Sequence, residues 1–318
     1  MMDPGGRAFL FLPSVLFLFQ CSSPPEVSVQ EVSVTSQSLA EIPDETVAQA
    51  AVDSGSPRVI LAALLEAYPD RISSLEIRNN DWSILVGGEL YYWAEGRLLP
   101  GYKLENAEDY VSYHFKPYPE ELPPLREFST EELDKLKEIL KQRESLNDTR
   151  FSGFMTSLWG MGDYLTAENT VIRTDFLGYN IRVHPDVEDA LKRVEMRILQ
   201  VAASDDAVAV WIENLSSAGA YVWRNIAGSA NRSLHSYGIA IDLIPGDYRG
   251  KQAYWRWAAD FYDEWWTIPY TERFQVPREV IEAFEAEDFI WGGKWLLFDQ
   301  IHFEYRPELI ILGRIAGN

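Results

Sequence analysis

The stretch Ser233-Leu-His-Ser-Tyr-Gly-Ile-Ala-Ile-Asp242 places His235 seven residues ahead of Asp242. Gly238 indicates a turn, and the apolar run Ile239–Ile244 that follows predicts a strand. Asp242 then lies among small and branched apolar side chains of that strand. Because burying a lone carboxylate is very unfavourable, we expect Asp242 to be paired, hydrogen-bonded or bound to a metal, with His235 as its neighbour.

A further ligand is expected from the C-terminal end, where Asp299-Gln-Ile-His-Phe-Glu-Tyr305 supplies His302. Two histidines, one carboxylate and an open position form the ligand set of a hydrolytic zinc site rather than a structural one. The sequence therefore predicts Zn²⁺ on His235, Asp242 and His302. Zinc lowers the pKa of a bound water from about 16 towards 7, which gives a nucleophile at neutral pH. Asp299, three residues before His302, is the general base expected to take up the proton of this water.

Other residues near this pattern are candidates for contacting a substrate. The segment Ala220–Trp223 predicts a short strand that ends at Arg224, whose guanidinium could polarise a scissile carbonyl or hold a substrate carboxylate. Ser233 either lines the site or caps the turn ahead of it. Trp291, in a Gly-rich loop, is expected to line a substrate groove.

Simpler alternatives remain for each of these residues. The two histidines and Asp242 could form a buried hydrogen-bonded network without metal. Asp299 could cap a turn, and Arg224 could form a surface salt bridge. Glu304 lies on the same strand face as His302, where it either orients the imidazole or is a solvated or structurally paired glutamate.

The pattern Ser233-x-His235-x-x-Gly238-x-Ala240-x-Asp242, followed by Asp299-x-x-His302, resembles the signature of the VanX/VanY-type zinc D-Ala-D-Ala peptidases and the related L-alanyl-D-glutamate endopeptidases of phage endolysins. The resemblance covers about residues 175–316. It implies zinc on the two histidines and Asp242, a catalytic carboxylate at Asp299, and substrate contacts at Arg224 and Ser233. The implied fold is the small α+β zinc-peptidase fold that is shared with the Hedgehog signalling domain.

Asp299 is similar to the endopeptidase branch, since the carboxypeptidase branch generally carries Glu at this position. The resemblance therefore implies a zinc metallopeptidase that cuts peptidoglycan stem peptides, preferentially at the L-Ala–D-Glu bond. Two alternatives stay open: a D-alanyl-D-alanine carboxypeptidase of the same fold, and a non-catalytic, zinc-containing lipoprotein that binds the cell wall. Trp223 stands where a cysteine is common in related sequences, which changes the shape of that subsite.

The N-terminus predicts export. Residues 1–20 are typical of a signal peptide, because Arg7 precedes an apolar run that is short for a membrane span. The stretch Leu18-Phe19-Gln20-Cys21 resembles a bacterial lipoprotein cleavage box, so Cys21 is the expected lipidated N-terminus; an ordinary signal peptide is the alternative. Residues 21–57 predict a flexible tether. We expect an exported protein anchored to a bacterial membrane through lipid alone.

Composition narrows the possible partners. The net charge of -21 disfavours nucleic acid, since phosphate binding needs clustered Lys and Arg. With one cysteine in the sequence, neither an internal disulfide nor a cysteine-based zinc site can form. The 318 residues are long enough for about two domains. We expect an accessory region at 58–170, a catalytic domain at 171–318, and a monomer.

The remaining patterns predict the secondary structure. In the accessory region, Trp82–Val86 and Glu89–Trp93 flank Gly-Gly and predict a hairpin, while Ser129 and Glu132 form a capping box for a helix. The catalytic region predicts a small, mostly antiparallel sheet flanked by helices, an α+β fold. The expected elements there are a strand at 176–183, helices beginning at Pro185 and Pro277, a helix at 207–215, a helix with an aromatic stripe at 251–266, and a final strand at 299–305.

Overall fold

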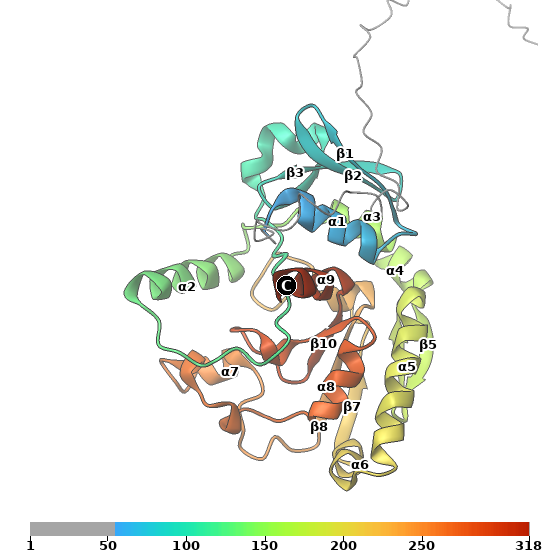
Figure 1. Ribbon diagram of the computed structural model, residues 1–318, viewed down its shortest axis with the longest axis vertical. Helices are drawn as coiled ribbons and strands as arrows, with labels where there is room; N and C mark the ends of the chain where they lie inside the picture. Colours follow the sequence, from blue (N-terminus) through green and yellow to red (C-terminus); the bar gives the residue numbers. More distant parts are fainter. Residues whose placement is uncertain (1–54, 318) are drawn as a thin grey trace, which may run out of the picture. The chain divides into compact units, whose positions relative to one another are not determined.

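The computed structural model describes residues 55–317 (Figure 1). The predicted signal peptide, Cys21 and nearly all of the predicted tether lie outside the described residues. Within the described range, no helix combines the length and the apolar character that crossing a membrane requires.

The N-terminal part of the described chain is a helix followed by an antiparallel sheet. Helix α1 (Pro57–Ala67) begins after Ser56, whose hydroxyl accepts a hydrogen bond from the Val59 N–H. The sheet has the order β1-β2-β3-β4, and its strands are β1 (Ile72–Arg78), β2 (Asp81–Val86), β3 (Glu89–Ala94) and β4 (Arg97–Pro100). The predicted hairpin is confirmed as β2–β3, because Gly87 and Gly88 both adopt the positive φ that a two-residue turn needs.

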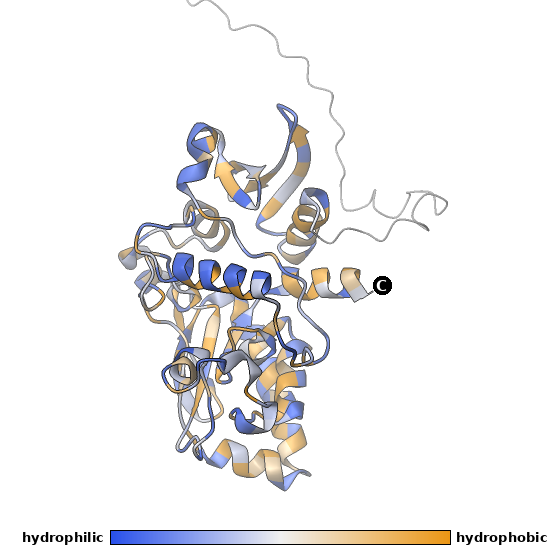
Figure 2. Cartoon of the chain, turned by 90° about the vertical axis from the view of Figure 1, so that its left-hand side faces the viewer, coloured by the Kyte–Doolittle hydropathy of each residue, from blue (hydrophilic) through white to orange (hydrophobic). Residues whose placement is uncertain are grey.

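Four helical segments connect this sheet to the rest of the chain. They are the 3₁₀ segment η2 (Gly101–Asp109), α2 (Thr130–Arg143), α3 (Gly153–Trp159) and α4 (Tyr164–Thr170). The predicted capping box is present at α2, where the Glu132 N–H donates to the Ser129 hydroxyl and the Ser129 N–H donates to the Glu132 carboxylate. Most of α2 is hydrophilic (Figure 2), and Leu136 is its buried residue.

The C-terminal part is built on a second antiparallel sheet with the order β7-β8-β10-β9. Its strands are β7 (Leu215–Gly219), β8 (Ala240–Pro245), β9 (Phe289–Trp291) and β10 (His302–Tyr305). The helices around it are α5 (Pro185–Ala202), α6 (Asp206–Glu213), α7 (Trp255–Ala259), α8 (Arg278–Glu285) and α9 (Pro307–Gly317). Small antiparallel sheets flanked by helices confirm the predicted α+β class.

Three local predictions were wrong. The strand expected at 176–183 is a hairpin of β5 (Ile172–Phe176) and β6 (Tyr179–Val183), because Leu177 and Gly178 form a turn with positive φ. The strand expected at Ala220–Trp223 lies one segment earlier, in β7. The helix expected at 251–266 is limited to α7, and the chain then turns into short 3₁₀ segments, η4 (Trp265–Thr267) and η5 (Tyr270–Glu272).

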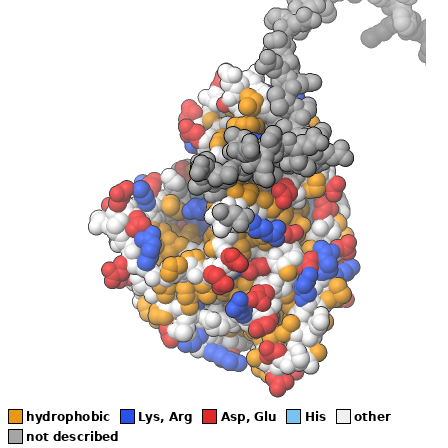
Figure 3. Space-filling model, viewed as in Figure 1, with side chains coloured by type: hydrophobic (Ala, Val, Ile, Leu, Met, Phe, Trp, Pro, Cys, Tyr) orange, Lys and Arg blue, Asp and Glu red, His pale blue; other side chains and the backbone are white. Residues whose placement is uncertain are grey.

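The two sheets share one hydrophobic core. Helix α1 lies beside α9 (Figure 1), and buried leucines of both helices, such as Leu61 and Leu312, belong to the same cluster as the inner side of β8. On that inner side, Ile239, Ile241 and Leu243 are almost fully buried, as the strand alternation predicts. On the face shown in Figure 3, acidic and basic side chains are interspersed.

Candidate metal centre

His235 is held by the backbone on both sides of its turn. It lies in the 3₁₀ segment η3 (Leu234–Tyr237), which ends at Gly238 with φ of 64°. The Nδ1 atom lies 2.5 Å from the carbonyl oxygen of Ala220, directly after β7. Because a carbonyl can only accept, Nδ1 carries the proton and Nε2 has the free lone pair. This Nε2 is buried and has no hydrogen-bond partner.

Strand pairing brings the other two predicted ligands together. His302 on β10 lies directly opposite Asp242 on β8. The Oδ1 atom of Asp242 is 2.7 Å from His302 Nδ1, and its Oδ2 is 3.2 Å from His235 Nε2. One ligand atom from each residue lies within 4.8 Å of the others. The three predicted side chains, one from a turn and two from strands, therefore meet at one point in the structure.

The donor set fits a zinc ion. Two imidazole nitrogens and one carboxylate oxygen are the ligands of a catalytic zinc site that retains an open position. The orphaned Nε2 of His235 is a buried lone pair aimed at the other two ligands, which is otherwise costly. Asp242 and His302 keep 24% and 17% of their side chains exposed, so the cluster is open to solvent on one side.

The electrostatics of the cluster favour a cation. Burial alone would raise the pKa of Asp242, but the neighbouring imidazoles of His235 and His302 outweigh burial and lower it. Burial alone would lower the pKa of His302, yet Asp242 and Glu304 raise it well above its ordinary value. The two carboxylates thus hold positive charge at His302, and a metal can take the place of the proton on Nδ1.

Asp299 is a carboxyl group of a different kind. Its Oδ1 is buried without a hydrogen-bond partner. Burial, together with the negative charge of Asp242, raises the pKa of Asp299 to about 6, although His302 opposes the shift. Its backbone N–H donates to the carbonyl of Gly292, where an added Cβ would lie 2.6 Å from the Asp299 carbonyl oxygen. A carboxyl group that titrates near neutral pH can accept a proton and return it.

Glu304 contacts the far side of His302. Its Oε1 lies 3.0 Å from His302 Nε2, and its Oε2 pairs with Arg306 Nη1 at 3.4 Å, so Glu304 makes both the imidazole contact and a structural pair. Because a carboxylate only accepts, Nε2–H donates to Glu304, and Nδ1 is the nitrogen directed at Asp242. In metal sites, a carboxylate that accepts a hydrogen bond from the second ring nitrogen of a ligating histidine orients its imidazole, and Glu304 has this position relative to His302.

The candidate substrate residues occupy different environments. Arg224 is exposed, and its backbone is fixed to the His235 turn through Ser236, whose hydroxyl accepts from the Arg224 N–H and donates to the Arg224 carbonyl. Ser236 was missed by the sequence analysis, although it lies next to His235 in the motif. Ser233 is buried, and its backbone N–H donates to the same carbonyl, while its side chain makes no capping bond.

The expectation that Trp291 lines a substrate groove does not match its position. Trp291 is the last residue of β9 rather than part of a loop, and it pairs with Phe303 of β10. Trp291 is 4% exposed and belongs to the hydrophobic core, and its Nε1 donates to the Gln300 carbonyl. The indole ring packs in the hydrophobic core on one side of the sheet, so neither face of the ring is accessible to a substrate.

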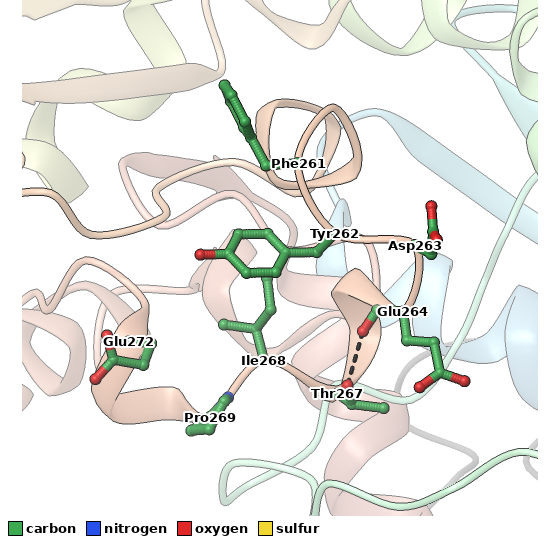
Figure 4. Close-up of a pocket in the computed structure, with 8 residues that line it drawn as sticks. All are labelled: Phe261, Tyr262, Asp263, Glu264, Thr267, Ile268, Pro269 and Glu272. Atoms are coloured by element: carbon green, nitrogen blue, oxygen red, sulfur yellow. Dashed lines mark hydrogen bonds between the residues drawn. The ribbon is translucent and has the colours of Figure 1, made fainter.

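A pocket of about 700 Å³ lies away from the predicted ligands. Figure 4 shows its lining, in which Tyr262 and Ile268 lie near each other and Thr267 donates to the Glu264 carbonyl. It is formed by the segment 261–272 that follows α7 and contains none of the predicted site residues. The metal centre is therefore recognised by its chemistry rather than by cavity size.

Comparisons with known families match two separate segments of the chain. Residues 227–305 match a family model described as D-alanyl-D-alanine carboxypeptidase. This segment contains the three predicted ligands and Asp299, whereas Arg224 lies just ahead of it. Residues 60–115, which include the N-terminal sheet, match a family described as Domain of unknown function (DUF8518).

No solved structure matches the chain significantly. The match at 227–305 supports similarity to the D-alanyl-D-alanine carboxypeptidase family, without distinguishing the VanX/VanY type within it.

Proposed function

We propose that this protein is a zinc-dependent peptidase that hydrolyses peptide bonds in peptidoglycan stem peptides, with the L-Ala–D-Glu bond preferred. One observation carries the proposal: His235, Asp242 and His302 converge within 4.8 Å, beside a buried carboxyl group at Asp299 whose pKa is about 6. The family match over the same residues supports a hydrolase of the peptidase type.

The side chains divide the work of peptide hydrolysis. His235 Nε2, Asp242 and His302 Nδ1 would hold the zinc ion, which acts as a Lewis acid and acidifies water. Asp299 takes up the proton of the nucleophile and returns it to the leaving amine, because its raised pKa makes both transfers accessible near neutral pH. Arg224, which is exposed, would bind a substrate carbonyl or carboxylate.

The second candidate function is a D-alanyl-D-alanine carboxypeptidase. The description of the matched family favours it, whereas the aspartate at position 299 favours the endopeptidase through the resemblance stated above. The two activities leave different products, since the carboxypeptidase releases terminal D-Ala and the endopeptidase cuts the stem nearer the sugar.

Mass spectrometry of purified muropeptides after incubation with the zinc-loaded protein tests the proposal. We expect fragments cut between L-Ala and D-Glu, and no fragments when the metal has been removed by a chelator. Free D-Ala as the product would establish the second candidate. Intact muropeptides with a zinc-loaded protein would leave the non-catalytic, wall-binding alternative.

We also propose that the protein is exported and held at a bacterial membrane by lipid on Cys21, and that it acts as a monomer. The signal-like residues 1–20 and the cleavage-box resemblance support this location. Replacing Cys21 with alanine should move the protein from the membrane fraction to the soluble fraction of the producing cells. Retention of the variant in the membrane fraction would exclude the lipid on Cys21 as the anchor.

A further inference from the structure

A continuous series of polar contacts runs from the metal ligand His302 to helix α1 of the N-terminal region. His302 Nε2 donates to Glu304 Oε1 at 3.0 Å, and Arg306 Nη1 donates to Glu304 Oε2 at 3.4 Å. Arg306 Nε donates to Glu308 Oε1 at 2.5 Å, and the Tyr68 hydroxyl donates to Glu308 Oε2 at 2.7 Å. We call these four residues beyond His302, namely Glu304, Arg306, Glu308 and Tyr68, the relay.

The fold explains why the relay reaches so far along the chain. His302 and Glu304 share one face of β10, and Arg306 and Glu308 lie at the junction of that strand with α9. Tyr68, the C-cap of α1, reaches Glu308 across the packed α1–α9 interface, 240 residues away in the sequence. Its ring is fixed edge-on against Trp159 with centroids 5.6 Å apart.

Each relay group depends on its neighbours for charge compensation. Glu308 is 2% exposed, and its two oxygens are divided between Arg306 and Tyr68. Tyr68 is 7% exposed, and burial together with Glu308 raises its pKa, so the hydroxyl stays protonated and donates. Removing one partner from such a series leaves a buried charge or acceptor unsatisfied, and the neighbouring groups must shift to compensate.

We infer that Tyr68, Glu308 and Arg306 are positioning residues that orient His302 through Glu304, so that helix α1 of the N-terminal region helps to form the metal centre. The inference rests on the proposed zinc site and assigns to the N-terminal region a role that the family matches do not supply. In metal sites, the carboxylate behind a ligating histidine fixes its ring orientation and basicity. In this protein that carboxylate, Glu304, is held by hydrogen bonds through Arg306 and Glu308 to Tyr68 at the end of helix α1.

The test is Tyr68→Phe in the full chain, because this change removes the hydroxyl and keeps the ring against Trp159. The zinc dissociation constant is measured by competition with a chelator, and the visible spectrum of the Co²⁺-substituted protein reports the ligand geometry. Loss of a group that hydrogen-bonds directly to a metal ligand lowers metal affinity by about 10- to 100-fold. Tyr68 is linked to His302 only through Glu308, Arg306 and Glu304, so we expect a smaller effect, about 3- to 10-fold weaker zinc binding. The cobalt bands should also shift.

Tyr91→Phe is the matched control. Tyr91 is a fully buried tyrosine of the same N-terminal region, and its hydroxyl donates to a glutamate, Glu89, outside the relay. This variant also loses a tyrosine–glutamate hydrogen bond, together with the 2.7 Å contact of the Tyr91 hydroxyl with Ser157 Oγ, so it measures the general cost to the fold. Its zinc affinity and cobalt spectrum should equal those of the wild type, and a change as large as that in Tyr68→Phe would overturn the inference.

A double-mutant cycle separates the relay from simple destabilisation. Tyr68→Phe and Glu304→Gln should be non-additive in zinc affinity, since both act on His302 through the same series. If Tyr68→Phe does not fold, Glu308→Gln replaces it in the cycle. Additive effects, or a zinc affinity unchanged by Tyr68→Phe, would overturn the inference while leaving the zinc site intact. A wild type that binds no zinc would overturn the proposed function and this inference together.

Discussion

Two aspartates that interact with His302 carry opposite shifts in pKa. Asp242 lies beside His235 and accepts a hydrogen bond from His302 Nδ1, and these two imidazoles lower its pKa despite burial. Asp299 has a buried oxygen without a donor, and burial raises its pKa to about 6. Pairs of carboxyl groups separated in this way divide into a permanently charged group and a group that exchanges protons. Asp242 therefore suits a ligand, and Asp299 suits the base.

This division predicts the effect of Asp299→Asn. The amide has the same shape but cannot accept the proton, so turnover should fall by about 10²- to 10⁴-fold, the usual contribution of a general base. Zinc content should stay at the wild-type level, because Asp299 is not one of the three converging ligands. Rates on muropeptides and elemental analysis of the same preparation test both parts. Wild-type turnover in the variant would remove Asp299 from the mechanism.

At the residue scale, the sequence predicted what depends on local spacing. His235, Asp242 and His302 were predictable because the strand period and the turn glycine place them, and the resemblance joins the two segments. The relay could not be predicted, since Tyr68 meets Glu308 only after α1 and α9 have packed. The burial of Trp291 likewise depends on the pairing of β9 with β10. The sequence analysis predicted a Gly-rich loop at Trp291 and no strand there.

At the scale of elements, the aromatic stripe at 251–266 shows where periodicity misleads. In a continuous helix, Trp255 and Trp265 would be separated by about 15 Å along the axis, at 1.5 Å per residue. In the structure their ring centroids are 5.2 Å apart, because the chain folds back after Ala259 and both rings join a small core with Phe298. Trp257 and Phe261, which a continuous helix would place on the same face as Trp265, are exposed at 48% and 78%.

The turn that carries His235 supports a prediction about Gly238→Ala. Gly238 has φ of 64°, and an added Cβ would lie 2.6 Å from the His184 backbone nitrogen. A left-handed non-glycine residue costs about 1–3 kcal/mol, and the clash with the His184 backbone adds to this. Unfolding by urea should show the loss of stability, and zinc affinity should fall because the turn positions His235.

Gly178→Ala is the control for this change. Gly178 also has a positive φ, of 84°, but nothing lies within 4 Å of its added Cβ. It should therefore show the backbone cost alone, with unchanged zinc affinity. Equal losses of stability in the two variants would contradict the close approach of the turn to His184.

At the scale of the whole molecule, the accessory and catalytic regions are not separate in their packing. Leu61 of α1 and Leu312 of α9 are both 0% exposed and belong to one hydrophobic core. The family match at 60–115 contains the first sheet, and the match at 227–305 contains β8, β9 and β10 of the second sheet. The sequence predicted an accessory region and a catalytic domain, but it could not show that α1 and α9 bury each other.

A shared core predicts cooperative unfolding of the two regions. Leu61→Ala, in the N-terminal helix, should lower the free energy of unfolding by about 2–5 kcal/mol, the usual cost of a large cavity. Near-ultraviolet circular dichroism and zinc release should follow the same, shifted transition. The exposed β1 residue Ile77, at 57%, gives the control Ile77→Ala, which should change stability by less than about 0.5 kcal/mol. Separate transitions for zinc release and for dichroism would contradict a common core.

The central claim is that His235, Asp242 and His302 bind one zinc ion, and elemental analysis of the purified protein after dialysis tests it most directly. We predict one zinc ion per chain in the wild type and a loss of retained zinc in Asp242→Ala, since the structure places this carboxylate between the two imidazoles. A metal-free wild type, or full zinc content in Asp242→Ala, would contradict the account.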